Sequence, residues 1–310
     1  MAVIAASSYS FHRLVKTGDA KRVDAPGLAR EAGAEAIEFA VGGSLSPPLD
    51  RRMALDLLHA SQDEGLPITG VCIAAELLRG SRASREAALT SVFEQLDSAA
   101  SMGVTRFRHD ATLGPENGDL SDESFNAALP SLVAACSAIA EHAAQLGIAS
   151  SVENHGRFVQ HALRVARLVQ AVNHRAFGVT LDIGNSLFAP QDPVEAAARL
   201  APFAITVHVK DFEIDPAVSP DAGSDGIWPT WPGGPMVRGC IVGAGDLDVA
   251  GCIGAALRSG FDGPFVVEFE GPVGDPRTAV ARGIGSLRAM LSARHALPRA
   301  VDTDPAGTAH

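Results

Sequence analysis

Four apolar runs decide the fold: Ser151-Val152-Glu153-Asn154-His155, Val179-Thr180-Leu181-Asp182-Ile183-Gly184-Asn185, Ile205-Thr206-Val207-His208-Val209-Lys210-Asp211 and Phe265-Val266-Val267-Glu268-Phe269-Glu270. Each run reads as a buried strand, and each carries a metal-capable side chain at its carboxyl end. These side chains are Glu153, Asp182, His208 and Glu268. A charge at such a place is costly unless another group pairs with it or binds it. Four such strand ends in turn indicate one shared purpose.

Working outward from these runs, the chain contains eight candidate strands. They cover residues 3–6, 36–40, 68–73, 105–107, 148–152, 177–181, 205–209 and 265–269. Amphipathic stretches lie between them; for example, Leu89, Val92, Phe93 and Leu96 follow the spacing of one helix face. Asp192-Pro193 has the composition of a helix start. Gly147-Ile148 is one of several joints at which a helix ends in Gly and a strand begins.

Alternation of strands and helices predicts a parallel sheet. Eight units in a chain of 310 residues fit a closed (β/α)8 TIM barrel. An open doubly wound sheet is the alternative, and it usually has a Gly-rich turn after its first strand. Ser7-Ser8-Tyr9-Ser10-Phe11 has no Gly, so the barrel is favoured.

We expect a single barrel domain over residues 1–298 and a disordered tail over residues 299–310, which are polar and aperiodic. The segment from Glu213 to Arg238 is predicted to be a long loop after the seventh strand. It contains both tryptophans, Trp228 and Trp231, and loops of this length in compact domains are usually functional. A packed lid over the barrel mouth is the expected role.

The composition restricts the class of protein. A formal net charge of −11 argues against a nucleic-acid partner. Four scattered cysteines without a C-x-x-C pair indicate buried thiols in a reducing cytoplasm. No apolar run in the sequence approaches the length that spans a bilayer, and we expect no membrane association. The opening residues 1–6 lack a basic region and read as the first strand rather than a signal peptide.

The four strand ends suit a metal ion. In a TIM barrel the carboxyl ends of the strands meet at one face, so residues far apart in sequence can share a ligand. Three carboxylates and one imidazole suit a hard or borderline divalent ion. We expect one such ion, with Mn²⁺ first and Mg²⁺, Co²⁺ or Zn²⁺ as alternatives. Taken singly, each residue is more often an ion-pair partner or a core histidine, so the prediction depends on the joint pattern.

The chain resembles the xylose-isomerase-like TIM-barrel superfamily, and within it the sugar phosphate isomerase/epimerase branch. The resemblance covers residues 3–295 and is strongest after residue 147. It depends on these motifs: Glu153-Asn154-His155, Leu181-Asp182-Ile183-Gly184-Asn185, His208-Val209-Lys210-Asp211, Gly243-Ala244-Gly245-Asp246-Leu247-Asp248 and Gly260-Phe261-Asp262-Gly263-Pro264 with Glu268.

The resemblance implies one catalytic divalent metal held by Glu153, Asp182, His208 and Glu268, and a sugar, keto-sugar or polyol substrate. It also implies that Glu153 and Glu268 act as an acid/base pair that removes and returns a proton next to a metal-bound carbonyl, through an enediolate. Glu270 has the same strand parity as Glu268, and we prefer Glu268 as the fourth ligand.

Further residues are expected at the substrate. His155 and Lys210 each follow a ligand by two positions and share its face. Asn185 stands where some sugar epimerases carry a substrate-contacting His, which weakens a simple ketose 3-epimerase assignment. Substrate contacts are also predicted for Arg238, Glu270 and Trp231. His109, beside Asp110 at the end of the fourth strand, is a candidate general base.

Three functions follow, with the isomerase or epimerase first. The alternative is a lyase on the same scaffold, either a dehydratase or an enzyme that cleaves C-glycosides or 3-oxo-glycosides by β-elimination. Because the His109 reading resembles the catalytic subunits of such C-glycoside-cleaving enzymes, it also implies a small β-rich partner subunit. A non-catalytic binding barrel is the third reading. A homo-oligomer is compatible with all three.

Overall fold

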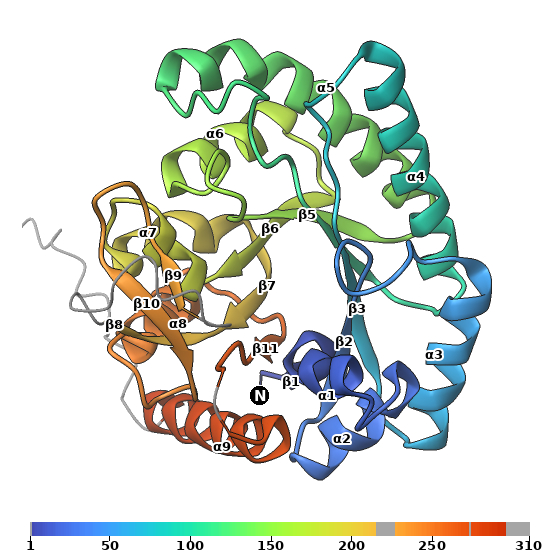
Figure 1. The fold of residues 1–310 in the computed structure, drawn as a ribbon, viewed down its shortest axis with the longest axis vertical. Coiled ribbons are helices and arrows are strands. Elements are labelled where there is room, and N and C mark those ends of the chain that lie inside the picture. Colours follow the sequence, from blue (N-terminus) through green and yellow to red (C-terminus); the bar gives the residue numbers. More distant parts are fainter. Residues whose placement is uncertain (1, 215–226, 273, 296–310) are drawn as a thin grey trace, which may run out of the picture.

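The computed structural model describes residues 2–214, 227–272 and 274–295, and these form a closed parallel β-barrel inside a ring of helices (Figure 1). Neighbouring strands follow the order β1-β11-β7-β6-β5-β4-β3-β2, which closes on itself. The predicted TIM barrel is therefore confirmed as a single domain. The barrel strands are β1 (Ile4–Ser7), β2 (Ala36–Val41), β3 (Ile68–Ile73), β4 (Arg106–His109), β5 (Ala149–Glu153), β6 (Phe177–Asp182), β7 (Ala204–Val209) and β11 (Phe265–Val267).

Helices follow the barrel strands and cover the outside of the sheet (Figure 1). Asp192 begins one of them as expected, because its carboxylate accepts a hydrogen bond from the Glu195 N–H at 2.8 Å. The α-helices are α1 (His12–Thr17), α2 (Ala25–Glu31), α3 (Arg51–Asp63), α4 (Arg82–Ala100), α5 (Asp122–Gln145), α6 (Ala162–Val172), α7 (Pro193–Leu200), α8 (Val249–Arg258) and α9 (Pro276–His295). Short 3-10 helices include η1 (Ser8–Phe11) and η3 (Gly184–Phe188).

Helix α5 is, by length and composition, apolar enough to cross a membrane, although the sequence led us to expect no run of that length. In the fold it lies between α4 and α6 on the outside of the barrel (Figure 1). Its side chains Phe125, Leu132 and Ile139 are fully buried. The helix ends before Gly147, whose φ of 73° lets the chain turn into β5.

The expected loop after the seventh strand is partly a small antiparallel sheet. Its strands are β8 (Asp211–Ile214), β9 (Ile227–Pro229) and β10 (Met236–Cys240), with β10 in the middle. The prediction of a loop from Glu213 to Arg238 is thus wrong at both ends. The Asp211 carboxylate fixes the sheet to the next loop by accepting hydrogen bonds from the N–H groups of Gly243 and Gly245, at 2.8 and 3.0 Å. Residues 215–226 and the predicted tail lie outside the described residues.

All four cysteines have free thiols, as the sequence suggested. Cys72, Cys136 and Cys252 are buried, and Cys240 is half-buried. Burial raises the pKa of each of the four thiols to about 12, so they remain protonated at neutral pH.

Replacing either of two glycines by alanine should change the stability of the fold, in opposite directions. A Cβ at Gly178 in β6 would lie 2.6 Å from the Phe203 carbonyl oxygen, whereas a Cβ at Gly285 in α9 would meet nothing within 4 Å. Gly178→Ala should destabilise the protein by about 1–3 kcal/mol through overpacking. Gly285→Ala should stabilise it by up to ~1 kcal/mol through helix propensity. Equal melting temperatures for the two variants would contradict this packing.

Candidate active site

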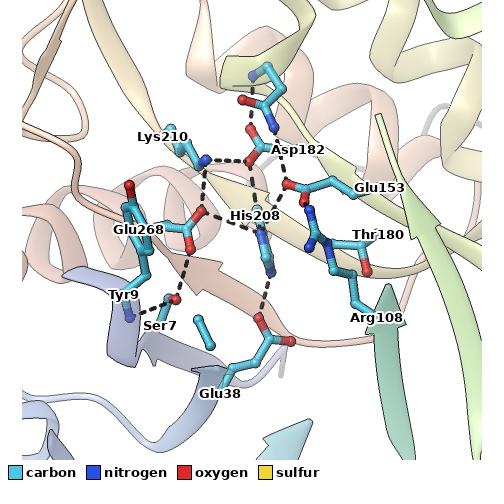
Figure 2. Close-up of polar contacts among 12 residues, drawn as sticks. Ser7, Tyr9, Glu38, Arg108, Glu153, Thr180, Asp182, His208, Lys210 and Glu268 are labelled. Atoms are coloured by element: carbon cyan, nitrogen blue, oxygen red, sulfur yellow. Dashed lines mark hydrogen bonds and ion pairs between the residues drawn. The ribbon is translucent and has the colours of Figure 1, made fainter. Parts of the chain in front are cut away.

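Each of the eight barrel strands contributes a polar or thiol side chain to one cluster inside the mouth. Seven of these side chains lie at or near the carboxyl end of their strand, and Glu38 lies in the middle of β2; Figure 2 shows the polar members. Because parallel strands place these ends on one face, the cluster gathers residues from the whole length of the chain. In strand order from β1 to β11 they are Ser7, Glu38, Cys72, Arg108, Glu153, Asp182, His208 and Glu268.

The four predicted metal ligands come together. Their ligand atoms all lie within 4.8 Å of one another. Measured from His208 Nδ1, the carboxylate oxygens are 3.6 Å away for Glu153, 3.8 Å for Asp182 and 3.7 Å for Glu268. Bonds of about 2.0–2.2 Å to a common ion would give ligand-to-ligand separations of this order. The structure brings Glu268, rather than Glu270, into this group.

The hydrogen bonds of His208 also fit a metal. Its Nε2–H donates to Glu38 Oε1 at 2.5 Å, so Nδ1 is the nitrogen that faces the three carboxylates. His208 Nδ1 is buried without a hydrogen bond among the described residues, and it faces Asp182 Oδ2, whose partner is the Lys210 ammonium group at 3.0 Å. Buried polar atoms are usually satisfied, so an orphaned imidazole nitrogen surrounded by three carboxylates is what a bound cation would explain. We infer that this donor set suits a divalent cation.

A second group, Glu38, Cys72 and His208, also has ligand spacing. His208 can serve it only through Nε2, and that nitrogen is already bonded to Glu38. Burial raises the pKa of Cys72 to about 12, which keeps the thiol protonated. A protonated thiol is a poor ligand, so we interpret Glu38 as the support that orients His208.

Lys210 is an ion-pair partner inside the cluster. Its Nζ lies 3.0 Å from Asp182 Oδ2 and 2.8 Å from both Glu268 Oε2 and Glu270 Oε1. Burial alone would lower the pKa of Lys210, but the three carboxylates raise it well above its ordinary value. In Glu268, burial favours the neutral acid, yet Lys210 and His208 lower the pKa to about 2. Burial and the neighbouring Glu268 raise the pKa of Glu270 despite Lys210.

Arg108 connects Glu153 to a second pair at the mouth. Its guanidinium donates to Glu153 Oε2 and, at 2.8 Å, to Asp110 Oδ1. The same Asp110 oxygen lies 2.9 Å from His155 Nδ1. The remaining oxygen of Glu153 accepts a hydrogen bond from the Asn185 amide at 3.1 Å. Glu153 is therefore held from two sides, and His155 is oriented by Asp110.

Two cavities open onto the cluster. An inner cavity of about 280 Å³ is lined by Glu153, His208 and Glu268. A mouth cavity of about 420 Å³ lies beyond it and is lined by Asn185 and Trp228, among others. The predicted substrate residues His155, Lys210 and Glu270 line both cavities.

Three predicted site residues lie elsewhere. Strand β4 continues to His109, so that residue faces outward; it is fully buried, 6.2 Å from the Phe177 ring, and lines neither cavity. A base role for His109 therefore has no geometric support. Arg238 pairs with Glu213 on the small sheet, with Nε 2.8 Å from the carboxylate, and lines neither cavity. Trp231 lines a separate pocket beside the mouth.

Sequence reasoning missed Glu38, did not name Arg108 as a site residue, and chose Trp231 rather than Trp228 from the expected lid as a substrate contact. Glu38 interrupts the apolar run Ala36-Ile37-Glu38-Phe39-Ala40, and that buried charge was the available signal. Arg106 and Arg108 are two residues apart, so their side chains lie on the same face of the strand. Whether that face points into the barrel could be decided only once the end of β4 was known. Nothing in the sequence distinguishes Trp228 from Trp231.

The chain matches the xylose isomerase-like TIM barrel family over residues 26–290. No functionally curated protein matches it. Among solved structures it is similar to a xylose isomerase-like TIM barrel protein from Mycobacterium smegmatis in complex with magnesium, with 19% identity, a TM-score of 0.68, and 94% of this chain and 97% of that one covered.

Two named enzymes have the same fold. An L-ribulose 3-epimerase superposes with a TM-score of 0.72 at 15% identity, covering 98% of this chain and 100% of that one. A probable 3-DHS dehydratase from Bacillus anthracis, involved in petrobactin synthesis, superposes with a TM-score of 0.68 at 16% identity. The match covers 92% of this chain and 98% of that one. At these identities the similarity shows the fold.

The interpretation of Glu38 predicts the behaviour of two variants. Glu38→Gln should weaken Mn²⁺ binding roughly 10–100-fold, because a supporting carboxylate orients the ligating imidazole. Cys72→Ala should leave the Mn²⁺ affinity close to that of the unmodified protein. Isothermal titration of both variants gives the comparison. A larger loss in Cys72→Ala than in Glu38→Gln would instead place the ion in the second group.

Proposed function

The chain belongs to the xylose isomerase-like TIM barrel family, and we propose that it is a divalent-metal-dependent epimerase or isomerase of a sugar or keto-sugar. Enzymes of this fold include sugar epimerases and a dehydratase, which supports a reaction that begins with C–H deprotonation. The proposal names Glu153, Asp182, His208 and Glu268 as the residues that would hold the ion.

The observation that carries the proposal is the placement of two carboxylates on opposite sides of His208 (Figure 2). Glu153 comes from β5 and Glu268 follows β11, with β6 and β7 between them. Epimerisation inverts one carbon, so it needs one group to remove the proton and another to return it on the opposite face. Two carboxylates that flank one inner cavity meet that need.

In this proposal a divalent cation would polarise the substrate's oxygens and stabilise the negative charge that develops on them. Glu268 starts as a carboxylate, consistent with its pKa of about 2. One carboxylate takes the proton from the carbon next to the carbonyl, and the C–H electrons pass into the carbonyl to give an enediolate. The other carboxyl group returns a proton to the same carbon. Arg108 and Asn185 keep Glu153 in position throughout.

Charge at the site favours an unphosphorylated substrate. The acids Glu38, Asp110, Glu153, Asp182, Glu268 and Glu270 outnumber the cations Arg108 and Lys210. Even with a divalent ion bound, the cluster remains negative. Both cations are already paired with carboxylates, so a phosphate in the inner cavity would meet net repulsion.

Deuterium uptake tests this function. With Mn²⁺ present, the protein should exchange a proton next to the carbonyl of at least one sugar in a panel of ketoses and keto-glycosides dissolved in D2O. Glu153→Gln and Glu268→Gln should each lower the exchange by about 10²-fold or more per bound ion. Asp182→Asn, a ligand change without a proton-transfer role, is the matched control and should retain more. Full exchange by metal-loaded Glu153→Gln would contradict the proposal.

A lyase is the second candidate, and the Asp110–His155 pair is the observation that favours it. Asp110 orients His155 through Nδ1, and the half-exposed ring lines both cavities. After the C–H proton is removed, elimination expels a group from the next carbon, and that group must receive a proton. A histidine held at the mouth can donate it.

Product analysis separates the two candidates. For a lyase, His155→Asn should lower the yield of unsaturated product about 10²-fold or more while deuterium exchange persists. His59→Asn, an exposed histidine on α3, is the control. If every substrate that exchanges deuterium is recovered without loss of a leaving group, the lyase reading is excluded.

A further inference from the structure

A third cavity, which we call the outer pocket, adjoins the mouth. It has a volume of about 660 Å³ and is lined by residues of the segments before α5, around η3 and after β9, including Trp231 and Leu120. Arg157 and Phe188 line both the outer pocket and the mouth cavity. The three cavities therefore lie next to one another in a row that starts at the metal-ligand cluster, because each shares lining residues with the next.

Trp231 is held in place as a wall of this pocket. A tight turn fixes it: Thr230 Oγ1 donates to the Pro235 carbonyl at 2.7 Å, and the Gly234 N–H donates to the Trp231 carbonyl at 2.8 Å. The indole sits directly on Gly234, where a Cβ would lie 2.6 Å from its ring atoms. One face of the ring is thus packed on backbone, and the side chain remains partly exposed at the pocket.

Apolar side chains gather around the same cavities. Among the described residues, the large apolar side chains that are exposed are few, and three of them are Leu113 at the mouth and Leu120 and Leu163 at the outer pocket. Phe188 adds a ring that packs edge-on against Phe212, with centroids 5.7 Å apart. Exposed apolar groups that line one hollow indicate a place for an apolar ligand face.

Arg157 stands at the junction of the two outer cavities with a charge that no carboxylate balances among the described residues. Arg164, by contrast, pairs with Asp122 at 2.8 Å, while Arg167, farther along α6, donates to the neutral Asn126 amide. Arg157 has a φ of 67°, an uncommon value for a residue with a side chain. The buried Gln160 side chain secures that backbone by accepting from the Arg157 N–H at 2.7 Å.

The strained position is tied to the site itself. The Gln160 amide donates to the Asn185 carbonyl at 2.8 Å, and the Asn185 side chain reaches the ligand Glu153. Unfavourable backbone conformations persist where the surroundings fix them, and such places are commonly functional. At Arg157 this backbone conformation places an exposed guanidinium group between the mouth cavity and the outer pocket.

We propose that the outer pocket binds a second ring linked to the sugar, with the flat face of that ring on Trp231 and Phe188 and an acceptor oxygen near it bound by Arg157. The ring is an aromatic aglycone or a second sugar residue, since both present a flat, partly apolar face to an indole. The substrate is then a glycoside or disaccharide derivative rather than a free monosaccharide. Only the placement of the first sugar at the metal cluster rests on the proposed function.

The chemistry of the pocket selects this occupant over a phosphate group. A phosphate would meet the guanidinium groups of Arg157 and Arg167, but the rest of its surroundings would include aromatic and aliphatic walls that it cannot use. An apolar ring uses those walls, and the guanidinium then needs only an acceptor oxygen, which hydroxyl, ether and carboxylate groups all supply.

Fluorescence reads this pocket without any catalysis. Trp228→Phe leaves Trp231 as the only tryptophan in the chain. In the Mn²⁺-loaded variant, phenyl β-D-glucopyranoside or cellobiose should change Trp231 emission and bind about tenfold more tightly than methyl β-D-glucopyranoside. The phenyl arm tests an aromatic aglycone, and the cellobiose arm tests a second sugar. If neither exceeds the methyl glucoside, or if D-glucose 6-phosphate exceeds both, the proposal is overturned.

Variants identify the pocket by calorimetry. In the otherwise unchanged chain, Trp231→Ala and Arg157→Gln should each lower the ratio of second-ring to methyl glucoside affinity about tenfold. Gly234→Ala, which keeps the indole but displaces it, should lower the same ratio. Leu146→Ala and Arg175→Gln, exposed residues outside all three cavities, should leave it unchanged. An unchanged ratio in the first three variants overturns the proposal.

The two proposals fail separately. A protein that binds the second ring through Trp231 but exchanges no deuterium retains the outer pocket and loses the epimerase assignment. A protein that exchanges deuterium in simple ketoses, and whose Trp231 emission ignores every glycoside, retains the assignment and loses the pocket.

Discussion

The burial of like charge at one end of the barrel is the constraint on which the rest of the site depends. Five acidic side chains there are almost completely buried: Glu38, Asp110, Glu153, Asp182 and Glu268. Isolated charges at such depth would unfold the strands that carry them or lose their ionisation. Lys210 and Arg108 offset part of the charge by touching several carboxylates at once. A divalent cation is the remaining compensation that the donor set suits, and under the proposed function its binding would add to the stability of the folded chain.

The sequence predicted the barrel and the ligand cluster because both follow from repetition. The carboxyl end of each strand lies at the same face of the barrel. A charged residue that follows an apolar run is therefore placed at that face in every unit. The errors arise where one or two residues decide a direction. Strand β4 runs to His109 instead of stopping at Phe107, and alternation then turns Arg108 inward and His109 outward. The charge of Glu38 within an apolar run marked it as unusual, but only the fold shows that its partner is His208 on β7.

The segment after β7 shows a different limit. Its Pro, Gly and Asp content predicted irregular structure, whereas β8, β9 and β10 pair as a small sheet. The pairing of β8 with β10 joins residues more than 20 positions apart, such as Val237 opposite Ile214, and composition holds little information about such partners. The same small sheet places Trp228 at the mouth and Trp231 at the outer pocket. The two tryptophans are only three residues apart, and the sequence alone does not show that they line different cavities.

The junction between β7 and this small sheet has a consequence for how the site is built. β7 ends at Val209 and β8 begins at Asp211, so Lys210 is the one residue between the two strands. The same lysine balances Asp182 and Glu268 inside the barrel. The sheet that carries Trp228 at the mouth is therefore anchored, at its first strand, to the residue that neutralises the centre of the cluster.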